Sequence, residues 1–149
     1  MIHEALDKIV AGHDLSRAEA ELAMEEILAG QTSTEQIAGL LVALRIKGES
    51  VDEIAGFATV MRRHATLIFP AGHAAPGGSP IIDTCGTGGD GLGTFNISTA
   101  TAFVVAGAGV RVAKHGNRSS GSRVGSADVL EALGVSIDIP AARVARSIE

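Results

Sequence analysis

The sequence predicts an α/β protein in two parts: a small N-terminal α-helical domain over residues 1–69, and the first part of a larger α/β domain with a mainly parallel sheet over residues 81–149. Three observations predict this fold class. Apolar residues recur at helical spacing in the first part, and short apolar runs alternate with helical segments in the second. A proline- and glycine-rich stretch at residues 70–80 separates the parts and is expected to be a linker. At 149 residues, 46% of them hydrophobic, the chain can bury a core.

The first part has a helical pattern from Ile2 to about Ile68. Apolar residues spaced by three and four predict its helices: Leu22, Ile27 and Leu28, then Ile37, Leu40, Leu41 and Leu44. Capping boxes predict three helix starts, at Ser16 with Glu19, Thr32 with Glu35, and Ser50 with Glu53. Gly30 and Gly48 fall where helices would end, and the last helix should run toward His64. We therefore expect four helices, with a possible dimer surface on this domain.

The second part is expected to alternate strands and helices. Its predicted elements are a short buried strand at Ile81–Ile82 leading into Asp83, a buried helix of small residues over 96–108, a second strand over 110–113, a helix over 126–133 capped by Ser126 and ended by Gly134, a third strand over 135–139, and a final helix opened by Pro140. Three short parallel strands with few covering helices would leave apolar strand surface uncovered. The segment is therefore expected to be the first part of a larger α/β domain.

Charge is distributed unevenly along the chain. The net charge is −5, yet residues 111–126 contain four basic side chains and no carboxylate, namely Arg111, Lys114, Arg118 and Arg123. Such a cluster suits phosphate, although a plain basic surface loop is the alternative. With four Phe and no Trp or Tyr, the chain nearly lacks the stacking platforms of nucleic-acid modules, so we expect no nucleic-acid partner.

Cysteine usage and the N-terminus indicate the compartment. Cys85 is the single cysteine, which excludes an internal disulfide and any multi-cysteine metal site and fits a reducing cytoplasm. We expect it to be a small buried filler. The N-terminus has no basic segment followed by an apolar one, and no run approaches the ~18 apolar residues of a membrane span. The expectation is a soluble cytoplasmic protein with no membrane partner.

A glycine-rich loop follows the first predicted strand. Residues 86–91 match G-x-G-x-x-G, the fingerprint of dinucleotide sites. The following helix begins only near Asn96, and Asp90 would repel a pyrophosphate unless a cation intervened. Lys114 and His115 stand where a ribose-binding carboxylate would be expected. A P-loop is also disfavoured, because the required lysine is missing.

The remaining interpretation of this loop is a phosphate cradle. Its amides, those at the start of the following helix, and the hydroxyls of Thr94, Ser98 and Thr99 can hold phosphate oxygens. The structural alternative is an ordinary helix start after a turn, with Asn96 or Ser98 as N-cap.

A second polar loop follows the second predicted strand and should open on the same sheet edge, where open α/β sheets bind ligands. Lys114 supplies a positive charge, Asn117 a hydrogen-bonding amide, and His115 is either structural or part of the site. Short hydroxyl donors lie between glycines: Ser119, Ser120, Ser122 and Ser126.

Four ordered motifs resemble anthranilate phosphoribosyltransferase: Asp-Thr-Cys-Gly-Thr-Gly-Gly-Asp, Thr-Phe-Asn-Ile-Ser-Thr, Val-Ala-Lys-His-Gly-Asn-Arg-Ser, and Gly-Ser-Ala-Asp-Val-Leu-Glu-Ala-Leu-Gly. The resemblance covers the whole chain, since the N-terminal helical segment resembles the family's small domain. It implies a nucleoside phosphorylase/phosphoribosyltransferase-like fold, a homodimer formed through the helical domain, and a role in tryptophan biosynthesis.

The implied reaction is phosphoribosyl transfer from 5-phosphoribosyl 1-diphosphate to anthranilate, giving N-(5-phosphoribosyl)anthranilate and diphosphate, with Mg²⁺ as cofactor. The resemblance assigns donor binding to Gly86, Gly89, Asp90, Thr94, Asn96, Ile97, Ser98, Thr99, Lys114, His115, Gly116, Asn117, Arg118, Ser119, Ser120, Gly121, Ser122 and Ser126. It assigns anthranilate binding to Gly86, Asn117 and His115, and a magnesium contact to Ser98. It requires no covalent nucleophile, since catalysis by positioning and charge neutralisation suffices.

Length is the departure from the family, whose members are about twice as long. Their later part supplies an arginine for the anthranilate carboxylate and an acidic pair for magnesium. The resemblance therefore implies that this chain holds the donor-binding half. Two alternatives stay open: a non-catalytic fragment or family relative that binds nucleic acid, and a dinucleotide oxidoreductase.

Overall fold

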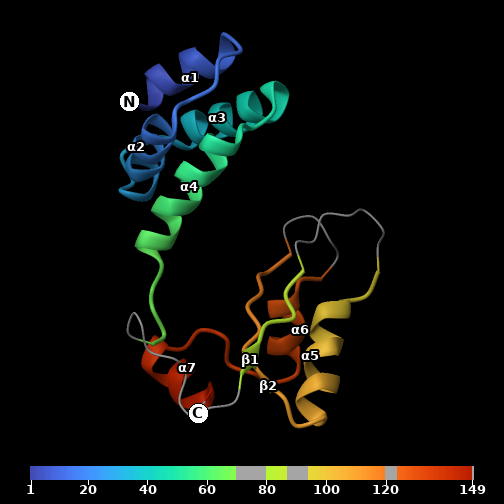
Figure 1. Cartoon of the computed structure of the whole chain (residues 1–149). Coiled ribbons are helices and arrows are strands. Elements are labelled where there is room, and N and C mark those ends of the chain that lie inside the picture. The colour runs from blue at the N-terminus through green and yellow to red at the C-terminus, as the bar shows by residue number, and fades with distance from the viewer. Residues whose placement is uncertain (70–79, 87–93, 120–123, 149) are drawn as a thin grey trace. The chain divides into compact units, whose positions relative to one another are not determined.

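The structure is a computed structural model that describes residues 1–69, 80–86, 94–119 and 124–148. The chain divides into two compact units, a helical unit at Met1–Thr66 and an α/β unit at Leu67–Glu149 (Figure 1). The predicted linker lies outside the described residues except for Pro80. So do five predicted donor-binding residues, namely Gly89, Asp90, Ser120, Gly121 and Ser122.

The helical unit contains the four expected helices: α1 (Ile2–Val10), α2 (Arg17–Leu28), α3 (Thr34–Lys47) and α4 (Val51–His64). Ser16 caps α2 and Ser50 caps α4, each accepting the amide of the glutamate three residues later while that glutamate's side chain accepts the cap amide. These two predicted boxes are confirmed. Gly30 and Gly48 lie at the ends of α2 and α3 with φ of 69° and 86°, a backbone conformation that favours glycine.

The predicted box at the start of α3 is displaced by one residue. Ser33 is the N-cap and Gln36 its partner, where Thr32 with Glu35 was predicted. The two boxes overlap in sequence and are locally equivalent. The observed box also places Gln36 Nε2 2.9 Å from Nε2 of His3, so a contact with α1 favours it.

The core of the helical unit forms where α2 packs on α4 and α1 packs on α3. Its buried cluster is Ile2, Ala5, Ile9, Leu15, Ala20, Ala23, Leu40 and Leu44. In α2 the buried residues are alanines, whereas Leu22 and Leu28 are 49% and 43% exposed. Gly56 explains this choice, because a Cβ there would lie 2.7 Å from the carbonyl oxygen of Arg17 and 2.8 Å from Ala20 Cβ. Small residues on both helices therefore allow close approach of their backbones.

A buried carboxylate stabilises the helical unit. Glu53 is 0% exposed, and its Oε1 accepts the Leu15 amide at 2.9 Å. Its Oε2 accepts the Ser50 amide at 2.7 Å and Lys47 Nζ at 3.0 Å. Burial by itself would raise the pKa of Glu53, but these hydrogen bonds and the lysine charge lower it overall. The glutamate thus joins the α1–α2 connection to the start of α4.

The α/β unit begins with one βαβ unit. Strand β1 (Ile81–Ile82) pairs in parallel with β2 (Arg111–Val112), Ile81 opposite Arg111 and Ile82 opposite Val112. Helix α5 (Ile97–Gly107) connects them and contacts β2 (Figure 1). The predicted fold class, with its parallel strands, is confirmed.

Three expectations for this unit are wrong: the buried helix, the buried first strand and the third strand. Helix α5 buries only Thr99, whereas Phe103 and Val104 are 54% and 72% exposed, because the described elements cover little of its surface. The strands are likewise only half-buried. The described backbone of residues 135–139 forms no strand. A strand needs a hydrogen-bonded neighbour, and that segment pairs with none in the described part of the chain.

The last two helices lie close to their predicted positions. Helix α6 spans Ser126–Ala132 with Gly125 as its N-cap, so Ser126 is its first residue and does not cap it as predicted. The reason is that Asp128 Oδ2 accepts the Gly125 amide at 2.7 Å, which places the cap one residue earlier. Helix α7 (Ala141–Ile148) follows Pro140 as expected. No helix in the described ranges is long and apolar enough to cross a membrane.

Candidate functional site

The connections after β1 and β2 meet at the carboxyl ends of these strands. Thr84 Oγ1 donates to the Ser98 carbonyl at 2.9 Å, which joins the β1 end to the first turn of α5. Asn96 Nδ2 donates to the Gly125 carbonyl at 3.3 Å, which joins the start of α5 to the start of α6. The described ends of the two loops therefore meet at one sheet edge, as predicted.

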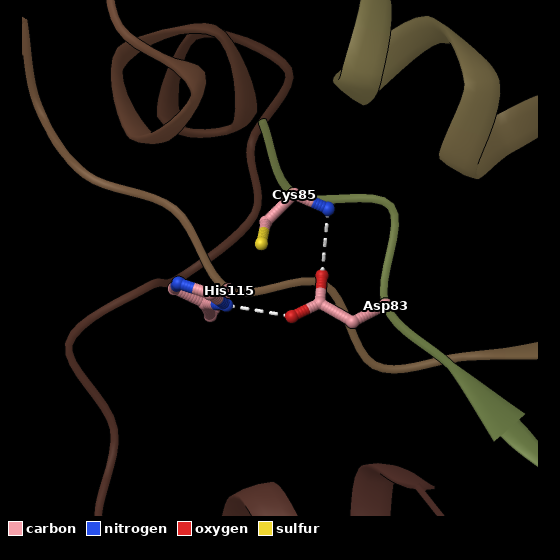
Figure 2. A group of neighbouring side chains, drawn as sticks. All are labelled: Asp83, Cys85 and His115. Atoms are coloured by element: carbon pink, nitrogen blue, oxygen red, sulfur yellow. Dashed lines mark hydrogen bonds and ion pairs between the residues drawn. The ribbon is translucent and has the colours of Figure 1, made fainter. Parts of the chain in front are cut away.

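His115 lies against the residues that follow β1. Its Nδ1 is 2.6 Å from Asp83 Oδ2, while Asp83 Oδ1 accepts the Cys85 amide at 2.9 Å (Figure 2). The hydrogen bond from His115 is the largest cause of a lowered pKa at Asp83, and the Cys85 amide adds to it. The carboxylate therefore stays ionised and orients the imidazole.

Cys85 is exposed, so its prediction as a buried filler is wrong. It follows the end of β1, beyond the two-stranded sheet, where the described residues do not cover it. Asp83 was missed as a site residue. Its signal in the sequence was its position as the first polar residue after a predicted strand, where open α/β sheets place their functional groups.

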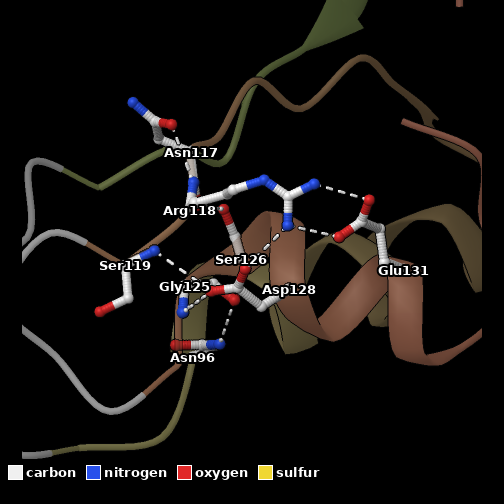
Figure 3. A network of polar contacts seen from close by, with 8 residues as sticks. All are labelled: Asn96, Asn117, Arg118, Ser119, Gly125, Ser126, Asp128 and Glu131. Carbon is white, nitrogen blue, oxygen red and sulfur yellow. Dashed lines mark hydrogen bonds and ion pairs between the residues drawn. The ribbon is translucent and has the colours of Figure 1, made fainter. Parts of the chain in front are cut away.

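A polar network organises the second loop (Figure 3). Arg118 forms a two-point ion pair with Glu131, with nitrogen–oxygen distances of 2.5 and 2.7 Å, and its Nη1 lies 3.3 Å from Asp128 Oδ1. Asp128 Oδ2 accepts the amides of Gly125 at 2.7 Å and Ser119 at 3.1 Å. These amides lower the pKa of Asp128, and Arg118 lowers the pKa of Glu131.

This network changes the electrostatics that the sequence indicates. The segment 111–126 carries no carboxylate of its own, but α6 brings two carboxylates to Arg118. The guanidinium is thus paired within the chain, which weakens the predicted role of its charge in donor binding. The Lys114 ammonium lies next to His115, with Nζ 3.0 Å from the His115 carbonyl oxygen. Asp128 and Glu131, which order the loop, were also missed as site residues, because they belong to the predicted helix that follows the polar loop and only packing brings them to Arg118.

Gly116 and Gly125 allow the backbone to pack closely in the described part of the second loop, and Gly86 differs from them. A Cβ at Gly116 would overlap Ser126 Oγ, and one at Gly125 would overlap the backbone at Ser119. At Gly86, by contrast, a Cβ would meet no atom of the described residues within 4 Å. Internal packing therefore explains Gly116 and Gly125 but not Gly86.

The start of α5 supplies amides and hydroxyls. Thr94 is exposed and Ser98 is half-buried in the first turn. The buried Thr99 hydroxyl has no hydrogen-bond partner among the described contacts. Asn96 is the N-cap residue, but its side chain makes no capping bond and turns to Gly125 instead. This disfavours the ordinary capped helix start as a full account of these residues, because Asn96 links the two loops.

Comparison with known proteins was made against families and individual relatives. The family described as "Glycosyl transferase family, helical bundle domain" matches residues 3–65, and "Glycosyl transferase family, a/b domain" matches residues 78–149. Anthranilate phosphoribosyltransferase of Pelotomaculum thermopropionicum is 60% identical over 93% of this chain and 39% of its own length. That of Moorella thermoacetica is 58% identical over 100% of this chain and 42% of its own.

A solved structure agrees with these sequence matches. The crystal structure of anthranilate phosphoribosyltransferase from Thermus thermophilus is similar with a TM-score of 0.74 and 44% identity, covering 97% of this chain and 42% of that one. The chain thus spans about two fifths of the length of the relatives it matches. With the helical-bundle and α/β domains matched in order over residues 3–65 and 78–149, the chain belongs to the glycosyl transferase family.

Proposed function

We propose that this chain carries the phosphoribosyl-donor-binding part of an anthranilate phosphoribosyltransferase of tryptophan biosynthesis. The reaction is transfer of a phosphoribosyl group from 5-phosphoribosyl 1-diphosphate to the amine of anthranilate, with release of diphosphate. The names of its relatives support this proposal. The observation that carries it is the convergence of two glycine- and hydroxyl-rich loops on the edge where parallel sheets bind ligands.

The donor is proposed to bind between these loops. Lys114 supplies positive charge for phosphate, and the amides and hydroxyls at the start of α5 supply neutral donors. Gly86 supports the assignment, because neither crowding by the described residues nor a positive φ requires a glycine there. A residue without a side chain at that point leaves room for a ligand to approach the backbone.

The acceptor is proposed to lie beside Gly86, Asn117 and His115. The His115 ring is held by Asp83 through Nδ1, so its other edge can line the pocket with a defined orientation. Asn117 Oδ1 accepts a hydrogen bond from the Arg118 backbone amide at 2.8 Å. We therefore assign the other end of the Asn117 side chain, Nδ2, to anthranilate. These contacts position the two reactants, which is the main contribution such a transfer requires.

Magnesium fits the donor types at the start of α5. Mg²⁺ prefers oxygen ligands and keeps waters and phosphate oxygens in its shell. Ser98 supplies a hydroxyl oxygen there. The hydrogen bond from Thr84 Oγ1 to the Ser98 carbonyl holds the first turn of α5 in place. When bound with the donor, the ion would neutralise charge that develops on the leaving diphosphate. The role of Ser98 would be to orient the ion toward the diphosphate.

We also propose a cytoplasmic homodimer formed through the helical unit. Large apolar side chains that the unit leaves exposed support an interface there, with Ile46 and Val51 81% and 83% exposed and Leu41 60% exposed. Sedimentation analysis tests this, and Ile46→Lys should shift a dimer toward monomer.

The proposal is tested by calorimetric titration of 5-phosphoribosyl 1-diphosphate, with and without Mg²⁺, into the purified chain. We expect saturable, magnesium-dependent binding that weakens more than about tenfold in Lys114→Ala, the loss of one charged phosphate contact. Asp90→Ala should weaken it as well. Arg143→Ala is the matched control, since Arg143 is an exposed cation of α7. Donor binding unchanged in Lys114→Ala would contradict the site, as would no binding to a folded chain.

Gly86→Ala separates ligand binding from folding. Because no atom of the described residues lies within 4 Å of the added carbon, thermal stability should stay unchanged while donor or anthranilate binding weakens. Gly116→Ala should instead disturb the second loop itself, since the added carbon overlaps Ser126 Oγ. Unchanged binding in Gly86→Ala would remove this residue from the site.

A further inference from the structure

Three side chains with different metal-binding atoms meet beside the proposed site. Asp83 and Cys85 follow β1, His115 follows β2, and all three are exposed (Figure 2). One ligand atom from each, a carboxylate oxygen, a thiol sulfur and an imidazole nitrogen, lies within 4.8 Å of the other two. In the described part of the chain this is the one such group of three.

The chemistry of this group differs from that of the proposed magnesium site. A thiolate and an imidazole are ligands that zinc and similar transition metals accept, whereas magnesium prefers oxygen. Around Zn²⁺, sulfur lies at about 2.3 Å and nitrogen and oxygen at about 2.0–2.2 Å, so neighbouring ligand atoms are roughly 3.3–3.8 Å apart. The three ligand atoms of this group lie within 4.8 Å of one another, and their side chains are exposed.

Neighbouring groups already orient two of the ligands. The Cys85 amide binds Asp83 Oδ1 at 2.9 Å, which leaves Oδ2 directed at His115 Nδ1. A hydrogen bond to the second oxygen of a ligating carboxylate is the kind of outer contact that orients metal ligands.

We propose that Asp83, Cys85 and His115 form a binding site for a divalent transition metal ion of the zinc class, with Oδ2, Sγ and Nδ1 as ligands and water at the remaining position. Binding replaces the hydrogen bond between Asp83 and His115. The Cys85 thiol loses its proton to solvent as the metal–sulfur bond forms, and His115 binds through an unprotonated Nδ1. Affinity should therefore rise with pH.

The chain offers a matched control in its other unit. His64 Nε2 lies 2.6 Å from Glu25 Oε2, so this pair has the same histidine–carboxylate separation but no cysteine beside it. If a histidine and a carboxylate were sufficient, both places would bind the ion. The proposal requires binding at the cluster alone.

The test is calorimetric titration of Zn²⁺ into the purified chain, together with absorption spectra of the Co²⁺-loaded chain. We expect one zinc site, weakened more than about tenfold in each of Asp83→Asn, Cys85→Ser and His115→Gln and unchanged in His64→Gln. The cobalt spectrum should show a thiolate-to-metal charge-transfer band that Cys85→Ser removes, because Cys85 is the single cysteine. Protons should be released on binding.

Three results would overturn the proposal. One is zinc affinity that is unchanged in Cys85→Ser and His115→Gln, and another is a cobalt spectrum without the sulfur band. The third is an equal loss of affinity in His64→Gln. Circular dichroism of each variant checks that it is folded. The titration uses neither donor nor Mg²⁺, so its failure would leave the proposed transferase function untouched.

Discussion

The helical unit and the α/β unit are stabilised in different ways. All nine hydrophobic residues that are buried in the described part of the chain lie in Met1–Thr66. Among the described residues of Leu67–Glu149, only Thr99 and Gly125 are buried. The first unit is held by an apolar core together with a buried carboxylate, and the second by polar contacts between loops that converge on one sheet edge. The comparison shows that order at the candidate site depends on charged and amide groups more than on apolar burial.

Amide hydrogen exchange should show the largest difference between the units. Amides of α2 and α4 lie in a packed core and should exchange far more slowly than those of α5 and α6, whose surfaces are mostly uncovered. Mass spectrometry of peptic fragments measures this. Protection in α5 equal to that in α4 would remove the contrast.

Glu53→Ala tests the buried carboxylate. The substitution leaves the amides of Leu15 and Ser50 without their acceptor and removes one of two carboxylates paired with Lys47, whose side chain is 8% exposed. We expect a loss of about 3–5 kcal/mol in the free energy of unfolding. Urea denaturation followed by helical circular dichroism measures it. Glu49→Ala, at an exposed position, is the control and should have little effect. Equal losses in both variants would show that the buried network contributes nothing specific.

Gly56→Ala and Gly39→Ala sharpen the argument about helix packing, because both glycines lie inside helices. At Gly56 the added carbon would lie 2.7 Å from a backbone oxygen of α2, so we expect a loss of about 1–3 kcal/mol. At Gly39 the nearest atom, Leu6 Cδ2, is 3.5 Å away, so helix propensity should stabilise the unit by about 0.5–1 kcal/mol. Thermal unfolding of both variants is the measurement. The same sign in both would contradict the packing argument.

The smallest expected effect is the pH dependence contributed by Glu19. Hydrogen bonds from Lys8 and Ser16 lower the pKa of Glu19 from 4.5 to about 2. Because the folded-state pKa is the lower one, its contribution to stability is present above pH 4.5 and is lost as the pH falls toward 2. Glu19→Gln should therefore lower the melting temperature at neutral pH and converge with the parent chain near pH 2. A constant difference at all pH values would contradict this assignment.

Local signals predicted the helical unit well. Ser16 and Ser50 begin helices because their side chains satisfy amides within the next turn, a contact that needs no distant partner. The displaced box at Ser33 shows the limit of that reasoning, since two overlapping boxes are equivalent locally and a contact with His3 in α1 accompanies the observed one. The burial of Ala20 in preference to Leu22 also depends on a partner, Gly56, that lies in another helix.

Prediction was weaker in the α/β unit. The order β1–α5–β2 was predicted from short apolar runs that alternate with a helical segment. The shared sheet edge was predicted because each polar loop directly follows a strand. The third strand failed, because a strand exists only through pairing with a neighbour. The exposure of Cys85 and of Phe103 depends on what covers them, which periodicity alone does not show.

The sequence by itself determined the two-part organisation, most helix starts, the parallel strand pair and the family, since these follow from contacts within a few residues or from ordered motifs. Only the tertiary structure decided which charged groups of the candidate site are paired with one another. It paired Arg118 with Glu131, turned a basic segment into a partly neutral one, and brought Asp83 to His115 across 32 residues. The physical reason is that charge interactions depend on distance in space, which a linear pattern does not specify until the elements are packed.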